Sequence, residues 1–227
     1  MNNPEDNHIK QPQFLSEIES KELLMQAGIA VTWPVLVCSP VEAAAVAREA
    51  GFPVVLKIVS PDIIHKSDCG GVMTGLTGPE AVEQAYNTIM TNVRRHYPQA
   101  EIKGISVQPQ AEPGTEVIIG VNRDPQFGPA VMFGLGGIWV ELLTDVSIRI
   151  APLLREDASE MIRSLKGYRL LQGYRGYPKV DTDTLEDWLL KISDLAINTP
   201  SLKELDINPV FAYPSGAIAV DARILLE

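Results

Sequence analysis

Cysteine, histidine and long hydrophobic runs are all scarce in this sequence. The two cysteines, Cys38 and Cys69, lie in unrelated contexts without CxxC spacing, so reduced thiols are expected rather than a disulfide framework. With only three histidines, a histidine-rich zinc site is disfavoured. No stretch approaches the roughly 18 apolar residues of a membrane-spanning helix. Residues 1–13 are polar, lack the apolar core of a signal peptide and are expected to form a flexible tail, which favours a cytoplasmic protein.

Basic residues are outnumbered as well. Lysine and arginine total 19 against 29 aspartates and glutamates, which gives a formal net charge of −10. This balance disfavours a nucleic-acid backbone or an anionic membrane surface as a partner. Nucleotides are not excluded, because a phosphate site is assembled locally from a few lysines, backbone amides and a metal ion.

What is present is an alternation of strand and helix signals, in a chain of 227 residues that is long enough for two lobes. We expect a first α/β lobe over residues 14–110 and a strand-rich second lobe over residues 111–227. Ser16–Glu19 and Ser39–Glu42 are capping boxes that predict the starts of two helices. Pro53–Val59 is β-branched and apolar apart from one lysine, which predicts a buried strand.

The second lobe is expected to contain several strands, two helices and a C-terminal hairpin. The predicted strands are Glu116–Val121, Ala130–Phe133, Ile138–Leu142 and Ser147–Ala151, and the predicted helices are Asp157–Leu165 and Thr184–Ile197. The hairpin pairs Leu202–Phe211 with Ala217–Leu225 through a turn at Pro214–Gly216, because proline and glycine favour turns between apolar runs.

Two features at the end of the buried strand are compatible with phosphate chemistry. Lys57 lies inside the apolar run, where its ammonium group needs solvent, a carboxylate partner or a bound phosphate. A glycine-ended loop, Ser60–Gly71, follows and carries His65. A loop histidine is usually structural or simply exposed, whereas as a functional group it acts as a general base, a metal ligand or a phosphoryl acceptor.

A glycine-rich stretch, Gly134 with Gly136 and Gly137, lies between two predicted strands. It matches the dinucleotide-binding GxGxxG pattern only loosely and lacks the helix that this fold requires, so a Rossmann fold is rejected. A plain turn and a turn beside phosphate both stay open for this stretch.

The C-terminal hairpin carries three oxygen-bearing side chains. Asp206 and Asn208 are two residues apart on one predicted strand and therefore share a face. Asp221 lies within apolar surroundings on the returning strand. Carboxylate and amide oxygens are ligands that Mg²⁺ prefers, so this hairpin predicts a magnesium site. The alternative is a polar strand face that is open to solvent.

Together these segments resemble the ATP-grasp fold, and most closely the β subunit of ADP-forming acetyl-CoA synthetases. The resemblance covers about Phe14 to Glu227 and implies two α/β (α+β) lobes with a nucleotide cleft between them. It rests on PVVLKIVSPDIIHKSDCGGV, VIIGVNRDPQFGPAVMFGLGGIWVELLTDVSIRIAPL, GYRG and KELDINPVF with AVDARI, whose order and spacing are more specific than any one motif. The ELDINP segment also resembles the magnesium motif of succinyl-CoA synthetase β chains.

The resemblance implies that the cleft binds ATP or ADP. Lys57 would hold nucleotide phosphates, Gln108 would lie beside the adenine, and Glu116 would face the ribose or the phosphates. Further residues that would line the same cleft are Gly134 to Gly137 (Gly136 and Gly137 above all), Glu141 and Arg149.

The resemblance also implies magnesium and a covalent relay. Asn208 and Asp221 would bind Mg²⁺, with Asp206 as a further ligand or as a group behind the ligands. His65 matches the family's second phosphohistidine, on a mobile loop that passes phosphate to the nucleotide. The family reaction converts acyl-CoA, ADP and phosphate into the free acid, CoA and ATP, and it is reversible.

Two parts of that reaction have no counterpart here, namely a CoA-binding Rossmann motif and the histidine that is phosphorylated first. The resemblance implies an α subunit that supplies both, in a heterotetramer or as part of a fused chain. Two other functions stay open: an ATP-sensing ATP-grasp module of an acyl-CoA synthetase-like acetyltransferase, and a carboxylate–amine ligase that uses an acyl phosphate. Retention of His65 together with Lys57, Asn208 and Asp221 favours the catalytic subunit.

Overall fold

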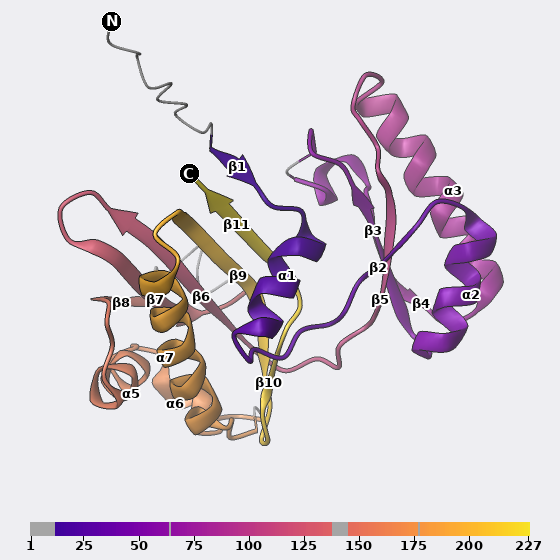
Figure 1. Ribbon diagram of the computed structural model, residues 1–227. Coiled ribbons are helices and arrows are strands. Elements are labelled where there is room, and N and C mark those ends of the chain that lie inside the picture. Colours follow the sequence, from indigo (N-terminus) through magenta and orange to yellow (C-terminus); the bar gives the residue numbers. More distant parts are fainter. Residues whose placement is uncertain (1–11, 64, 138–144, 177) are drawn as a thin grey trace, which may run out of the picture.

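The computed structural model describes residues 12–63, 65–137, 145–176 and 178–227. Two β-sheets form the centres of two lobes that lie side by side (Figure 1). The chain passes from the smaller lobe to the larger one between β5 and β6. Among the described residues, no helix is both long enough and apolar enough to cross a membrane.

The smaller lobe is built on a four-stranded antiparallel sheet. Its strand order is β2 (Val35–Val37), β5 (Gly104–Pro109), β3 (Val54–Val59) and β4 (Val72–Leu76). Helices α2 (Pro40–Ala50) and α3 (Pro79–His96) cover one face of this sheet (Figure 1). Every residue of β3 is buried, because the helices cover one side of the strand and the larger lobe covers the other.

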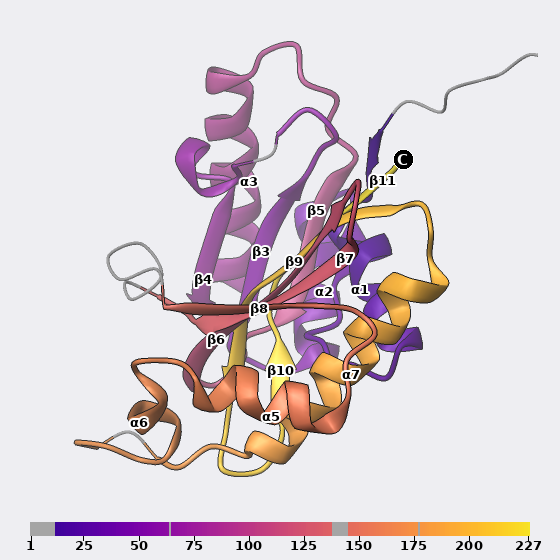
Figure 2. The same ribbon diagram turned by 90° about the vertical axis from the view of Figure 1, so that its left-hand side faces the viewer.

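The larger lobe is built on a seven-stranded sheet. Its order is β1 (Gln13–Phe14), β11 (Ala222–Leu226), β9 (Leu202–Ala212), β6 (Thr115–Asp124), β7 (Gly128–Leu135) and β8 (Val146–Ile150), with β10 (Ala217–Ala219) paired to β9. Helices α5 (Arg155–Arg163), α6 (Tyr168–Leu171) and α7 (Thr182–Asn198) lie on one side of it (Figure 2). On β9, Leu205 and Ile207 enter the core, so Asp206 and Asn208 face the opposite side of the sheet.

The first helix, α1 (Glu17–Gln26), begins at the predicted capping box and lies between the lobes (Figure 1). The predicted first lobe, residues 14–110, includes this helix, but the contacts of the helix are mainly with the larger lobe. Strand β1 pairs with β11, α1 packs against β11, and Leu24 and Ile29 enter the core of the larger lobe. This placement sets the start of α1 opposite β3 of the smaller lobe.

Most predicted elements are present within a few residues of their expected bounds. The predicted returning strand of the hairpin is interrupted at Val220 and Asp221, which separates β10 from β11. At α2, the Glu42 carboxylate accepts the Cys38 amide at 2.8 Å and not that of Ser39, so only half of the predicted capping box forms. Strand β1 and helix α6 were not predicted, and Ile138–Leu142 lies outside the described residues.

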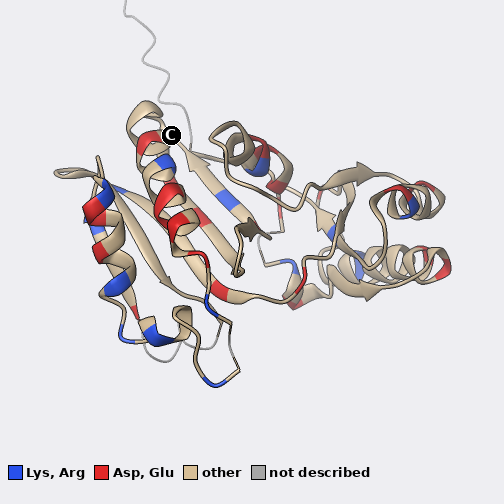
Figure 3. Cartoon of the chain, turned by 90° about the horizontal axis from the view of Figure 1, so that it is seen from below, with Lys and Arg blue, Asp and Glu red and all other residues tan. Residues whose placement is uncertain are grey.

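The acidic side chains are spread over the outer faces of the helices, and α7 in particular carries several (Figure 3). The global charge of −10 therefore says little about the space between the lobes.

Candidate functional site

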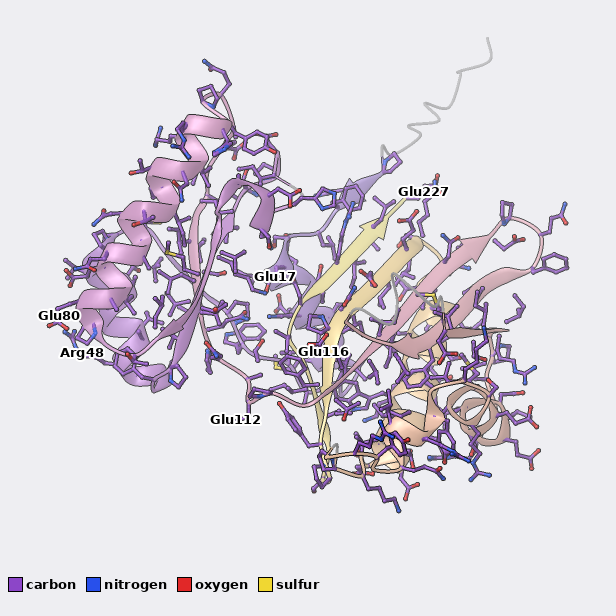
Figure 4. The ribbon with its side chains drawn as sticks, turned by 180° about the vertical axis from the view of Figure 1, so that it is seen from behind. Glu17, Arg48, Glu80, Glu112, Glu116 and Glu227 are labelled. Atoms are coloured by element: carbon purple, nitrogen blue, oxygen red, sulfur yellow. The ribbon has the colours of Figure 1, made fainter. Side chains whose placement is uncertain are left out.

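A buried cluster of charged side chains joins the two lobes. Glu17, at the start of α1, accepts hydrogen bonds from three lysine ammonium groups (Figure 4). Its Oε1 lies 2.9 Å from Lys21 Nζ and 2.7 Å from Lys57 Nζ, and its Oε2 lies 2.7 Å from Lys66 Nζ. The side chains of Glu17 and Lys21 are 4% and 0% exposed, so these charges depend on one another and not on water.

Each lysine comes from a different element. Lys21 lies one turn after Glu17 on α1, Lys57 lies on β3, and Lys66 follows His65. Lys21 Nζ also donates to Thr32 Oγ1 at 3.1 Å and to Gln108 Oε1 at 2.8 Å, which fills its donor capacity.

The interruption between β10 and β11 supplies acceptors to this cluster. Lys57 Nζ lies 3.3 Å from the Val220 carbonyl and 3.5 Å from Asp221 Oδ1. Gln108 Nε2 also approaches the Val220 carbonyl, at 3.5 Å. In a continuous strand the Val220 carbonyl would accept a hydrogen bond from the neighbouring strand. The interruption leaves this carbonyl available to Lys57 and Gln108 of the smaller lobe.

Mutual attraction decides the protonation of the cluster. Burial acts to raise the pKa of Glu17, but the ammonium groups of Lys57, Lys21 and Lys66 outweigh it and hold this pKa well below its usual range. Burial lowers the pKa of Lys21 to about 8, against the attraction of Glu17. The pKa of Lys66 is raised: burial opposes its charge, but Glu17 and Asp221 favour it more strongly.

A cavity of about 460 Å³ opens next to this cluster, within the size range of small-molecule sites. Residues from both lobes line it, namely Glu17, Val59, Lys66, Asp206, Asn208 and Asp221. Lysine donors lie on one side and carboxylate and amide oxygens lie on the other. Such a cavity suits a polyanion that arrives together with a cation.

The predicted metal residues are brought together on this wall. The side chains of Asp206 and Asn208 project from the same face of β9. The backbone N–H of Asn208 donates to the backbone carbonyl of Asp221 at 3.2 Å, which brings Asp221 beside them. Burial raises the pKa of Asp206, and the charge of Asp221 raises it further. Burial likewise raises the pKa of Asp221. A nearby cation would relieve the cost of holding these two carboxylates charged.

Within the part of the chain that the structure describes, no group of three or more His, Cys, Asp and Glu side chains could by itself hold a metal ion. The donor set here is two carboxylates and one amide, which matches Mg²⁺ sites that are completed by water and by phosphate oxygens. It does not match a metal site formed by protein ligands alone.

His65 is exposed in the segment that connects β3 to β4, just before a short 3₁₀ turn (Ser67–Cys69). Two contacts to the Lys66 carbonyl hold the turn in place. The Cys69 thiol lies 3.2 Å from this carbonyl, and the Gly71 amide donates a hydrogen bond to it at 2.8 Å. A Cβ on Gly71 would lie 2.7 Å from Ile58 Cγ2, so only glycine allows this approach. The imidazole itself is free to meet a ligand.

The remaining predicted residues do not join this cluster. Glu116, Gly136 and Gly137 lie together at the neighbouring end of β6, where the Gly136 amide donates to the Glu116 carbonyl at 2.7 Å (Figure 4). Arg149 pairs in register with the core residue Val131, so its side chain lies on the helix side of the sheet.

In that position Arg149 forms an ion pair with Glu160 of α5 at 2.8 Å, away from the cavity. Gln108, expected beside the adenine, is buried at the edge of the charged cluster, and its side-chain carbonyl oxygen accepts from Lys21 Nζ at 2.8 Å. Glu141 lies outside the described residues.

Four members of the cluster were not identified from sequence, namely Glu17, Lys21, Thr32 and Lys66. The available signal was the spacing of Glu17 and Lys21, because a Glu–Lys pair four residues apart shares a helix face. Such pairs are common on exposed helices, so the spacing alone does not predict burial.

Comparison with known proteins places these features in a family. The chain matches the family described as ATP-grasp domain over residues 8–226. It is 50% identical over 212 residues to the β subunit of acetate–CoA ligase [ADP-forming] I of Pyrococcus furiosus, covering 93% of this chain and 91% of that one. It is 48% identical over 185 residues to acetate–CoA ligase [ADP-forming] I of Archaeoglobus fulgidus, but covers only 27% of that longer protein.

The fold also matches a solved protein, the dinucleotide-forming acetyl-coenzyme A synthetase 1 of Ca. Korarchaeum cryptofilum. The TM-score is 0.93 at 51% identity, over 95% of this chain and 94% of the matched one, in a complex with coenzyme A and Ca-AMPCP. Other structures of that synthetase contain a phosphorylated phosphohistidine segment in a site I orientation, or Mg-AMPPCP with the segment pointing towards the nucleotide binding site.

Proposed function

The chain belongs to the ATP-grasp domain family, in the group of ADP-forming acetate–CoA ligase β subunits, and on that premise we propose that it transfers a phosphoryl group between His65 and ADP or ATP. The main observation in support of this phosphoryl transfer is the cavity between the lobes. It is lined by Lys66 and by a carboxylate–amide wall, and it adjoins the buried Lys57 and the His65 turn. We further propose that residues 1–13 act as a tail, residues 14–110 as the first lobe and residues 111–227 as the second lobe, with α1 of the first segment packed on the second lobe.

The proposed step exchanges one bond for another. With the second ring nitrogen of phosphorylated His65 protonated, a terminal phosphate oxygen of ADP attacks the phosphorus, the N–P bond breaks with its electron pair staying on nitrogen, and ATP forms with a neutral imidazole. Lys57 and Lys66 balance the phosphate charge, and Gln108 and Glu116 orient the base and the sugar. Within the complete reaction, acyl-CoA, ADP and phosphate give the acid, CoA and ATP.

Asp206, Asn208 and Asp221 would hold Mg²⁺. When bound, the ion would neutralise part of the negative charge of the phosphates. Their shared face, and the absence of a self-sufficient metal cluster among the described residues, support a site that forms only with the nucleotide.

An α-type partner supplies the rest of the reaction. The relative in Pyrococcus furiosus is one subunit of a split ligase, while the chain spans about a quarter of the single-chain ligase of Archaeoglobus fulgidus. The partner carries the CoA-binding part and the histidine that is phosphorylated first. We propose a heterotetramer of two chains of each kind.

Replacing Lys57 with alanine is expected to weaken ADP binding roughly ten- to a hundred-fold, or about 1.5–3 kcal/mol, because a charge-assisted hydrogen bond to phosphate is lost. Glu17 keeps Lys21 and Lys66 as partners, so the variant should fold. Calorimetry on the 227-residue chain measures the affinity. Lys179→Ala removes the same charge from an exposed position and is the control. Unchanged ADP affinity in folded Lys57→Ala would refute this role.

Asn208→Ala and Asp221→Ala are each expected to weaken Mg²⁺-dependent ADP binding by at least about ten-fold. Glu204→Gln serves as the control, because Glu204 is exposed on the same face of β9 and does not line the main cavity. Titrations with Mg²⁺ and with excess EDTA separate the metal from the nucleotide. If EDTA leaves ADP binding of the parent chain unchanged, the hairpin is a polar strand face and not a metal site.

A further inference from the structure

We propose that Glu17 is a positioning residue: it ties down the segment that carries His65 and gives up its lysines to nucleotide phosphates. The proposal rests on the function above, because it needs a phosphate-bearing ligand in the cavity. It concerns residues 65–71, here called the His65 loop.

Glu17 holds the His65 loop through a single contact. Its Oε2 accepts from Lys66 Nζ at 2.7 Å, and Lys66 is adjacent to His65. Glu17 comes from α1, which packs on the larger lobe, whereas the loop extends from β3 of the smaller lobe. The ion pair therefore fixes the position of the loop relative to the opposite lobe.

One carboxylate serves three lysines in this cluster. The two oxygens of Glu17 accept from Lys21, Lys57 and Lys66, and Asp221 adds only a longer contact of 3.5 Å to Lys57. A phosphate would therefore offer these ammonium groups acceptors that a single carboxylate cannot. A nucleotide polyphosphate carries several negative charges and three acceptor oxygens on its terminal group, so it competes well with one carboxylate.

Lys66 is the lysine best placed to change partners. Its side chain is 20% exposed and lines the cavity, while those of Lys21 and Lys57 are 0% and 7% exposed. Lys21 has two further acceptors and stays with Glu17. When phosphates occupy the cavity, Lys66 can follow them and leave Glu17, which frees the His65 loop to move.

In the Korarchaeum synthetase the phosphohistidine segment is seen in more than one orientation. A segment that moves must break whatever holds it. Among the described residues of this chain, the ion pair between Lys66 and Glu17 is the charged contact that links the His65 loop to the opposite lobe. Its loss on nucleotide binding would couple occupancy of the cavity to release of the histidine.

The first test uses the nucleotide-free chain. Hydrogen exchange of the His65 loop should be faster by roughly ten-fold in Glu17→Gln and in Lys66→Gln, because each variant removes one end of the same charged contact. Glu22→Gln is the matched control, since Glu22 is exposed on the same helix and the substitution changes the net charge equally. Loop exchange equal to that of the parent in folded Lys66→Gln overturns the proposal, even if Glu17→Gln fails to fold.

The second test uses the sign of the change in ADP affinity. Because Glu17 competes with phosphate for Lys57 and Lys66, Glu17→Gln should bind ADP roughly ten-fold more tightly than the parent. Lys66→Gln should bind it more weakly. If Glu17 only supported the lysines structurally, Glu17→Gln would bind ADP less tightly, and that result overturns the proposal.

The two tests separate this proposal from the proposed function. A parent chain that binds no ADP would refute the nucleotide function, whereas the exchange comparison without nucleotide would still decide whether Glu17 holds the loop. Normal ADP binding with unchanged loop exchange in both variants would keep the function and eliminate the role of Glu17.

Discussion

Replacing His65 with alanine is expected to reduce turnover of the complete enzyme, this chain with its α-type partner, by on the order of 10³-fold or more. The reason is chemical: without the imidazole no N–P bond can form, and no other described side chain near the cavity is a histidine. ADP affinity should stay close to that of the parent, since the exposed His65 does not line the cavity.

The measurement combines turnover with a label. Incubation with labelled ATP, Mg²⁺ and the partner should give a phosphoryl label on this chain that is lost in acid and stable in base. His96→Ala is the control, because His96 is exposed at the end of α3 and contacts only the Asn92 carbonyl, at 2.9 Å. The label should disappear in His65→Ala and persist in His96→Ala.

This experiment also distinguishes the catalytic subunit from an ATP-sensing module. A sensor would bind ADP through Lys57 and the hairpin but would not be labelled at His65. Full turnover by His65→Ala with its partner would contradict the relay and leave His65 as an exposed turn residue.

Much of the fold was predictable because its local signals agree with its packing. The buried run at β3, the helix starts at Ser16 and Ser39, and the C-terminal hairpin all occur where the sequence predicts them. The alternation along β9 places Asp206 and Asn208 on one face, as a period of two requires. Local periodicity was sufficient for these elements.

The charged cluster was not predictable, because its burial is a tertiary effect. The buried face of α1 consists of Glu17, Ser20, Lys21 and Leu24, which have ideal helical spacing but are mostly polar. The helical spacing of Ile18, Leu23, Leu24 and Ala27 predicts an apolar face instead, but of these four only Leu24 is fully buried. Partners from β3, β5, Thr32 and the His65 loop are what make burial of the polar face favourable.

Arg149 was assigned to the cleft by resemblance, and its strand register places it elsewhere. Family resemblance implied a cleft residue, but the register with Val131 places its side chain on the helix side of the sheet. A shift of one residue in a strand reverses the face of every side chain, so a family motif alone does not determine which face Arg149 occupies.

Replacing Glu17 with alanine is expected to destabilise the chain by about 3–5 kcal/mol, because removing one partner of a buried ion pair strands the other charges. Lys21 would keep only Thr32 and Gln108 as hydrogen-bond partners at 0% exposure, and Lys57 would keep Val220 and Asp221. Denaturant unfolding of parent and variant measures the difference in free energy, and Glu22→Ala, on the exposed side of α1, should change it far less.

Two further measurements test the cause. The double variant Glu17→Ala/Lys21→Met should be more stable than Glu17→Ala alone, because methionine removes the stranded ammonium at similar volume.

The pH dependence of the stability of Glu17→Ala should also reflect a stranded Lys21 charge. Burial lowers the pKa of Lys21 to about 8, and Glu17 opposes that shift, so this pKa should fall further in Glu17→Ala. At neutral pH the unfolded variant, whose Lys21 is fully protonated, then binds more protons than the folded variant. The stability deficit of the variant should therefore shrink from neutral pH to about pH 9. A deficit that is unchanged by pH and by Lys21→Met would mean that lost packing, and not a stranded charge, destabilises the variant.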